Sequence, residues 1–180
     1  MKIMKYTACI CFIFFAHSAI ASLTPEVIDA ARYGEVKIIK KAIASGIDIN
    51  ETDSHGYTLL ILATYHGQYT TVKYLLSQGA DPSILDHHGR SALMGAAFKG
   101  DLNAAKIILK DPRANINQQN EVGQTAAMYA ALFGHKAFLA YLLKQGANLS
   151  LSDKKGNSAA TLAKQQGNTS LSEWITSQRK

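Results

Sequence analysis

The sequence predicts an all-α solenoid of about five 33-residue helix-turn-helix units with short β-hairpin-like finger loops. The first observation is a ladder of glycines spaced by 33 or 34 residues: Gly56, Gly89, Gly123 and Gly156. A second glycine ladder and an alanine ladder keep the same step, at Gly34, Gly67, Gly100, Gly134 and Gly167 and at Ala30, Ala63, Ala96, Ala130 and Ala163. All three ladders slip by one residue at Asp111-Pro112-Arg113. Because the three ladders share one period and one slip, they belong to a single repeating unit.

The first 21 residues have the features of a secretory signal peptide. Lys2 and Lys5 flank an apolar run that continues to Ala16, and Ala19-Ile20-Ala21 is a small-x-small cleavage site. An apolar run of about a dozen residues is shorter than the roughly 20 needed to span a bilayer. We expect cleavage before Ser22, with an uncleaved anchor as the alternative. The short leader with its Ala-x-Ala end indicates a bacterial periplasmic protein that is not inserted in the membrane after cleavage.

Residues 22–180 are expected to form one repeat domain, with repeats at about 24–52, 53–85, 86–119, 120–152 and 153–180. Repeats two to five open on an Asx-x-x-Gly motif, as in Asp53-Ser-His-Gly56. An Asx side chain followed by a glycine at positive φ favours a tight turn. Two residues later comes a hydroxyl side chain that predicts a helix N-cap. These predicted caps are Thr58, Ser91, Thr125 and Ser158.

Two helices follow each cap. The first contains small packing residues such as Ala96-Ala97 and is ended by the mid-repeat glycine. The second has apolar residues at helical spacing, for example Val72, Leu75 and Leu76, and so buries one face. A glycine such as Gly79 then ends it as a left-handed C-cap.

These motifs resemble the ankyrin repeat, with its D-x-x-G turn, A-A-x-x-G helix end and L-L-x-x-G-A-D/N helix end. The resemblance covers about Thr24 to Ile175. The sequence departs from the family's T-P-L-H helix start, because Leu59, Ala92, Ala126 and Ala159 stand at the proline positions. Proline at the first helical position pre-sets φ. Its absence predicts softer helix starts.

The charge and the cysteine content of the chain argue against several classes of function. The chain is 47% apolar with a net charge of +6, spread along the sequence, which does not indicate a nucleic-acid partner. Both cysteines, Cys9 and Cys11, lie in the predicted signal peptide. The mature chain therefore has no thiolate metal site, cysteine nucleophile or disulfide.

No catalytic motif is present: the sequence lacks G-x-S-x-G, G-x-G-x-x-G, a P-loop and H-E-x-x-H. We expect no cofactor and no enzyme activity. The histidines of adjacent repeats, above all His55, His66, His87 and His88, are the one metal candidate. Packed helices lie about 10 Å apart, whereas metal ligands lie about 2 Å from one ion, so exposed loop histidines are expected.

The resemblance implies that partners bind the fingers and the first helices. The residues just before each mid-repeat glycine then face this groove, and four are aromatic: Tyr33, Tyr65, Phe98 and Phe133. Exposed aromatic residues in successive units are typical of a binding surface, although such rings also fill packing gaps. With the mostly basic fingers, the predicted partner-binding set is Tyr33, His55, Tyr57, Tyr65, His66, His87, His88, Arg90, Phe98, Lys99, Val122, Gln124, Leu132, Phe133, Lys154 and Lys155.

We therefore expect a monomeric, non-enzymatic protein-binding module with an acidic partner. A small exported ankyrin protein of this layout resembles two known groups of proteins. One is associated with catalase and resistance to hydrogen peroxide, and the other consists of immunity proteins that neutralise antibacterial toxins. The sequence does not choose between these roles. A hydrolase or metal-dependent enzyme is the remote alternative, because it would need a nucleophile and base that the sequence does not show.

Overall fold

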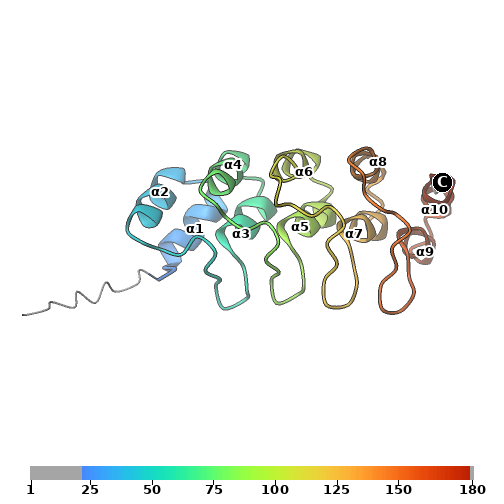
Figure 1. The fold of residues 1–180 in the computed structure, drawn as a ribbon, viewed down its shortest axis with the longest axis horizontal. Helices are drawn as coiled ribbons and strands as arrows, with labels where there is room; N and C mark the ends of the chain where they lie inside the picture. Colours follow the sequence, from blue (N-terminus) through green and yellow to red (C-terminus); the bar gives the residue numbers. More distant parts are fainter. Residues whose placement is uncertain (1–21, 179–180) are drawn as a thin grey trace, which may run out of the picture.

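The computed structural model of the protein describes residues 22–178, and the predicted signal peptide lies outside them. Over this range the chain forms ten helices in five pairs and no β-strand (Figure 1). The pairs are α1 (Pro25–Tyr33) and α2 (Val36–Ala44), α3 (Leu59–Tyr65) and α4 (Tyr69–Ser77), α5 (Ala92–Lys99) and α6 (Leu102–Ile108), α7 (Ala126–Leu132) and α8 (Lys136–Lys144), and α9 (Ala159–Gln165) and α10 (Thr169–Ser177).

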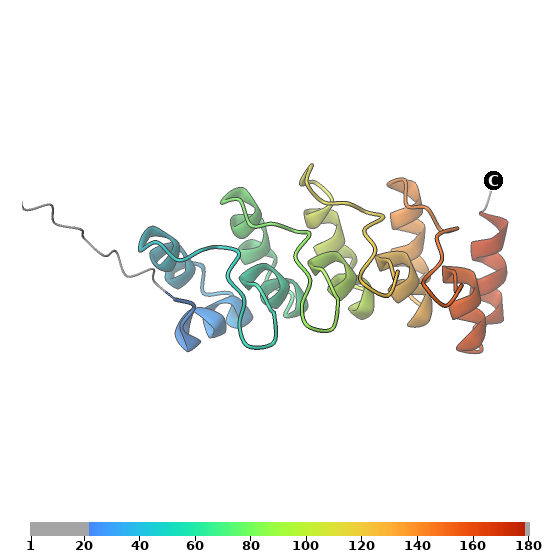
Figure 2. The ribbon, with the colours of Figure 1, turned by 60° about the horizontal axis from the view of Figure 1, so that its bottom comes forward.

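The helices form two rows. The odd-numbered helices α1 to α9 lie side by side in an inner row, each in contact with the next, and the even-numbered helices form an outer row beside it (Figure 1). The loops between pairs extend away from the outer row as four fingers, which stand next to one another in Figure 2. The all-α solenoid predicted from the repeat is therefore confirmed.

The starts of the inner helices follow from single side chains. Thr58 Oγ1 accepts a hydrogen bond from the Ile61 backbone N–H at 3.2 Å, which satisfies one of the free donors at the start of α3. Ser91, Thr125 and Ser158 accept in the same way at α5, α7 and α9, so the predicted N-caps are confirmed. In α1 the cap is Thr24, followed by proline at the first helical position.

Each finger is held by one Asx side chain. Asp53 Oδ1 accepts from the backbone N–H groups of His55 and Tyr57 at 2.8 and 2.9 Å. Asp86, Asn120 and Asp153 repeat this pattern in the other fingers. The fingers are short and hairpin-like: in each one the backbone N–H of the Asx residue donates to the carbonyl four residues later, as from Asp86 to Arg90 at 3.0 Å. Isolated bridges also pair the finger arms at Thr52–Thr58 and Ser152–Ser158.

The extra residue in the repeat is accommodated by an arginine. At Asp111-Pro112-Arg113 the glycine that ends the other second helices is missing. The Arg113 guanidinium donates to the backbone carbonyls of Gly79 and Leu76, at 3.0 and 3.2 Å. Asp111 holds the same guanidinium, and this hydrogen bond keeps the pKa of the Asp111 carboxyl below its ordinary value. The insertion therefore ties the third repeat to the second.

The core lies between the two rows. Alanines such as Ala63, Ala97 and Ala131 are fully buried between the inner helices, where small side chains let neighbouring helices approach closely. Larger side chains such as Leu75 and Leu142 fill the space toward the outer row and are also fully buried. The last helix, α10, covers the open end of the stack with Leu171, Ile175 and the half-buried Trp174.

Leu75→Ala and Leu142→Ala should each lower the free energy of unfolding by about 2–5 kcal/mol, because each leaves a cavity in the middle of the stack. Chemical denaturation followed by circular dichroism measures the loss. The matched control is Lys73→Ala, an exposed change on the same helix as Leu75, which should shift stability by less than about 0.5 kcal/mol. Equal effects of the leucine and lysine changes would contradict this packing.

Candidate functional site: the groove face

The predicted partner-binding residues come from the carboxyl ends of the inner helices and from the four fingers. We call the surface that these ends and fingers form the groove face. The hollows that border it include one between the second and third repeats and one of about 600 Å³ bordered by Val122, Lys154 and Leu162. The groove face is therefore a shaped surface and not a flat one.

Most of the predicted residues are accessible. Tyr33 is 71% exposed, Val122 54% and Phe133 45%, and these are the large hydrophobic side chains most open to solvent in residues 22–178. His55, His66, His87, His88, Lys99, Lys154 and Lys155 are also exposed. Tyr57, Tyr65, Arg90, Phe98, Gln124 and Leu132 are half-buried.

The aromatic residues of the groove face form a ladder of rings. Tyr65 and Phe98 stack with ring centroids 6.2 Å apart, and Phe98 meets Phe133 edge to face at 4.5 Å. Tyr65 and Phe98 are half-buried, because these rings cover one another, whereas Tyr33 and Phe133 are exposed. Part of each ring remains accessible, so the ladder both packs the repeats together and presents an aromatic edge.

Polar side chains join successive repeats through backbone carbonyls of the ladder residues. Lys99 Nζ donates to the Tyr65 carbonyl at 2.8 Å and lies 4.6 Å from the centre of the Tyr65 ring. His135 Nε2 lies 3.1 Å from the Phe98 carbonyl, which can only accept, so this nitrogen carries the proton. His135 and Lys99 therefore each tie their own repeat to the preceding one through a backbone carbonyl.

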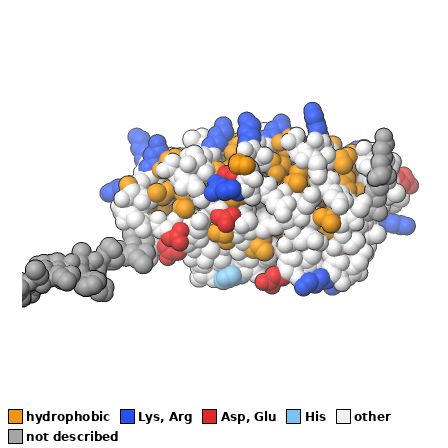
Figure 3. Space-filling model, in the orientation of Figure 1, with side chains coloured by type: hydrophobic (Ala, Val, Ile, Leu, Met, Phe, Trp, Pro, Cys, Tyr) orange, Lys and Arg blue, Asp and Glu red, His pale blue; other side chains and the backbone are white. Residues whose placement is uncertain are grey.

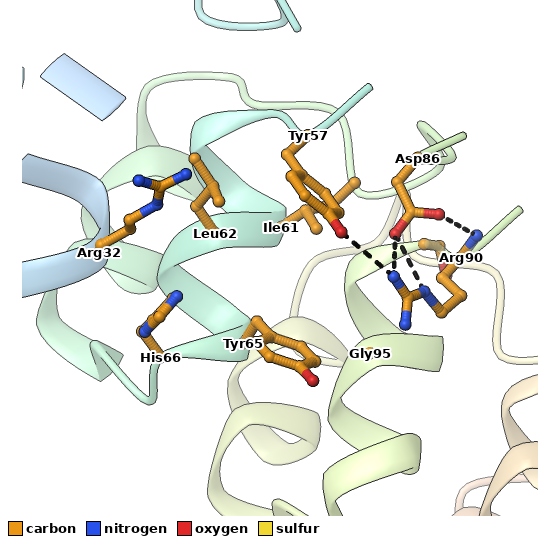
Figure 4. A pocket seen from close by; sticks show the side chains of 10 residues that line it. Arg32, Tyr57, Ile61, Leu62, Tyr65, His66, Asp86, Arg90 and Gly95 are labelled. Carbon is orange, nitrogen blue, oxygen red and sulfur yellow. Dashed lines mark hydrogen bonds and ion pairs between the residues drawn. The ribbon is translucent and has the colours of Figure 1, made fainter. Parts of the chain in front are cut away.

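The hollow between the second and third repeats is a cavity of about 400 Å³. Figure 4 shows its walls: Tyr57 and Ile61 on one side, Tyr65 below, Arg32 and His66 at one end and Arg90 at the other. Gly95 of α5 lies on its border. This volume is within the range of small-ligand pockets and suits one or two side chains of a partner.

Arg90 is the most constrained polar group of the cavity. Its Nε and Nη2 each lie 3.0 Å from Asp86 Oδ2, and Nη2 donates to the Tyr57 hydroxyl at 3.4 Å. The Asp86 side chain is almost fully buried. Because Asp86 Oδ1 already accepts two backbone N–H groups, both of its oxygens are occupied. Asp86 therefore positions Arg90 and is not free to act as a base.

The positive charge of the protein is unevenly distributed. Exposed lysines gather over the outer row in Figure 3, and helices α2, α4, α6 and α8 contain no Asp or Glu: the lysines are Lys37, Lys40, Lys41, Lys73, Lys106, Lys136 and Lys144. The sequence-based view of an evenly spread charge is wrong here, because the amphipathic outer helices all turn their polar side outward. On the groove face, Arg32 and Arg90 line the cavity between the second and third repeats, and Lys154 and Lys155 border the other hollow.

The pKa of His66, at one end of the cavity, lies below its ordinary value. Partial burial lowers its pKa most, and the nearby charges of Lys99 and Arg32 lower it further. A low pKa keeps the imidazole neutral at pH 7. No group of three or more His, Cys, Asp or Glu side chains in the described part of the chain is arranged to hold a metal ion.

Sequence reasoning missed two parts of this cavity. The Asx-x-x-Gly motif predicts only a turn role for Asp86, whereas in the structure its carboxylate also holds the Arg90 guanidinium. Gly95 was overlooked, although it is the one glycine that belongs to none of the glycine ladders or helix-ending positions. This departure from the repeat pattern is the feature of the sequence that points to the cavity.

Two rows of short helices with fingers along one side define a helical repeat protein with an extended binding face. The chain belongs to the ankyrin repeat family: the family model for ankyrin repeats (3 copies) matches residues 27–120 and again 93–179. Ankyrin repeats are protein–protein interaction modules. A comparison with curated protein sequences gave no match. In the described range, none of the helices has the length and apolar character required to cross a bilayer.

Lys99→Gln should raise the pKa of His66 toward its ordinary value of 6.5, because it removes one of the two positive charges that oppose protonation. NMR titration of the imidazole C–H signals measures the change. Lys155→Gln, which removes a charge from the last finger, serves as the control and should leave the His66 titration unaltered. An unchanged or lower pKa in Lys99→Gln would show that the two side chains are not electrostatically coupled.

Proposed function

We propose that the protein is a non-enzymatic module that binds a protein partner through the groove face. The single observation that supports this most is the ladder of Tyr65, Phe98 and Phe133, which ends in an exposed ring. Aromatic side chains with a packed base and an open edge are typical binding anchors, because they lose little conformational freedom on association. Exposed Tyr33 and Val122 extend the same face on either side.

A binding role also fits the polar groups of the groove face. Arg90 is paired with Asp86, and Lys99 and His135 contact backbone carbonyls, so these groups hold the repeats in position. A nucleophile with an adjacent free base, which hydrolysis requires, does not occur among them. The cations around the cavity favour an acidic partner and would mainly affect the rate of association.

We propose further that the chain is exported to the bacterial periplasm and processed to residues 22–180, the repeat domain. The charged start, short apolar run and Ala19-Ile20-Ala21 site of the sequence support this. In that compartment a catalase-associated protective role is the finer form of the proposal, with neutralisation of an antibacterial toxin as its alternative. The genes beside this one, encoding a catalase or a secreted toxin, would discriminate between the two roles.

Phe133→Ala should abolish capture of the partner while keeping the fold. Loss of its edge-to-face contact with Phe98 should cost about 0.5–1.5 kcal/mol of stability, whereas loss of an aromatic anchor costs an interface about 2 kcal/mol or more. The measurement pairs the melting temperature with the set of proteins retained from a periplasmic extract and identified by mass spectrometry.

The matched control for this experiment is Lys106→Ala, an exposed change on the outer helix α6. It should capture the same proteins as the wild type. A Phe133→Ala protein that retains every wild-type partner, or one that melts far below the wild type, would refute a binding role for the aromatic ladder.

The exported protein should begin at Ser22. Its N-terminus can be sequenced after release from cells by osmotic shock. Recovery of intact Met1 in the membrane pellet would contradict cleavage and would favour an uncleaved anchor.

A further inference from the structure

Gly95 is the one glycine of the chain that the backbone does not require. All the other glycines have positive φ, where residues with a side chain are strained. Gly95 lies inside helix α5 with helical geometry, where glycine weakens the helix relative to alanine. The equivalent positions in neighbouring repeats are occupied by Leu62, Tyr129 and Leu162. The glycine must therefore be explained by what the missing side chain leaves open.

The missing side chain leaves open the cavity between the second and third repeats. A Cβ atom at Gly95 would lie 4.0 Å from the Tyr65 ring, an ordinary contact distance, so nothing occupies the space above the glycine. Figure 4 shows Gly95 between the Tyr65 ring and Arg90 at the border of this space. A leucine at this position, as in the second repeat, would project into the cavity and fill part of it.

The cavity combines an apolar wall with a fixed guanidinium. Tyr57, Ile61 and Tyr65 supply apolar surface. Asp86 and the Tyr57 hydroxyl engage Nε and Nη2 of Arg90, while Nη1 makes no hydrogen bond to the described residues. The guanidinium also lies 5.9 Å from the centre of the Phe98 ring, so it is supported on a third side. An arginine immobilised in this way loses little freedom when it binds an anion.

The charges around the cavity are positive in balance. Arg90 is paired with Asp86, and Arg32 is paired with Asp29 at 3.0 Å. Lys99, above the Tyr65 ring, has no carboxylate partner among the described residues. An added carboxylate would meet these cations, whereas both nearby aspartates already have partners.

We infer that this cavity binds a carboxylate together with an adjacent apolar side chain, as an acidic peptide segment of the partner would present them. Arg90 holds the carboxylate, with Lys99 and Arg32 adding attraction, and the apolar group enters the space above Gly95 between Tyr57 and Tyr65. The inference rests on the proposed function for the source of the segment. The carboxylate itself comes either from the end of a chain or from an Asp or Glu side chain.

Three small probes test the chemistry directly on the processed protein. N-acetylphenylalanine carries a terminal carboxylate, N-acetylphenylalaninamide carries none, and the capped dipeptide acetyl-Glu-Phe-amide carries only a side-chain carboxylate. Titration followed by two-dimensional NMR should give a Kd on the order of 1 mM for at least one carboxylate probe. The amide should bind at least about tenfold more weakly. The carboxylate probe that binds more tightly identifies the source.

Two substitutions of Gly95 distinguish an effect on the cavity from an effect on the helix that contains it. Gly95→Ala strengthens the helix without filling the space, so it should melt higher than the wild type and bind the probes within about threefold of the wild type. Gly95→Leu fills the space and should weaken binding at least about tenfold. The shifted signals in the wild type should belong to the cavity, including the Arg90 Nε–H, which makes the test independent of how Gly95→Leu folds.

Three results would overturn the inference. The first is that neither carboxylate probe binds at a concentration about 10-fold above the expected Kd. The others are that the amide binds as tightly as the carboxylate probes, or that the shifted signals belong to residues outside the cavity. Failure of the probes while Phe133→Ala still loses partner capture would refute the cavity and leave the proposed function standing. Probe binding with no partner captured by the wild type would refute the proposed function and leave a site for small carboxylates.

Discussion

The structure depends on close contact between successive inner helices. Each repeat is too small to bury its own apolar surface, so it is stable only when the next repeat covers it. Alanines at the contact, such as Ala63, Ala96 and Ala130, let the helices approach closely. Gly100 at the end of α5 serves the same approach, because a Cβ atom there would lie 2.7 Å from the His135 ring of the following repeat.

This close stacking also builds the groove face. The contacts that join the repeats, from Lys99 to the Tyr65 carbonyl and from His135 to the Phe98 carbonyl, use the backbone of the ladder residues themselves. A change in the stacking of two repeats would therefore displace the rings that the face presents. The contacts that stabilise the stack therefore also fix the positions of the rings on the groove face. A rigid stack offers a partner a preformed surface.

The third repeat departs from the others in ways that produce its special features. Gly95 replaces a larger side chain in its inner helix and opens the cavity, and Arg90 in its finger supplies the charge. Its second helix lacks the terminal glycine and is instead tied back by Arg113. In a repeat protein, positions that break the pattern carry the most information about function, since the pattern itself is explained by folding.

The sequence by itself determined the period, the turns, the caps and the order of the helices. These features depend on local rules: an Asx side chain closes its own turn, a hydroxyl caps its own helix, and a glycine supplies positive φ. It also indicated most residues of the groove face, because the same register recurs in each repeat. Only the tertiary structure decided which rings are exposed, since Tyr65, Phe98 and Phe133 cover one another across repeats. Asp86 and Arg90 pair within one finger, four residues apart, but only the fold decides that Asp86 is buried. The space above Gly95 likewise arises from the packing of neighbouring repeats, which no local pattern encodes.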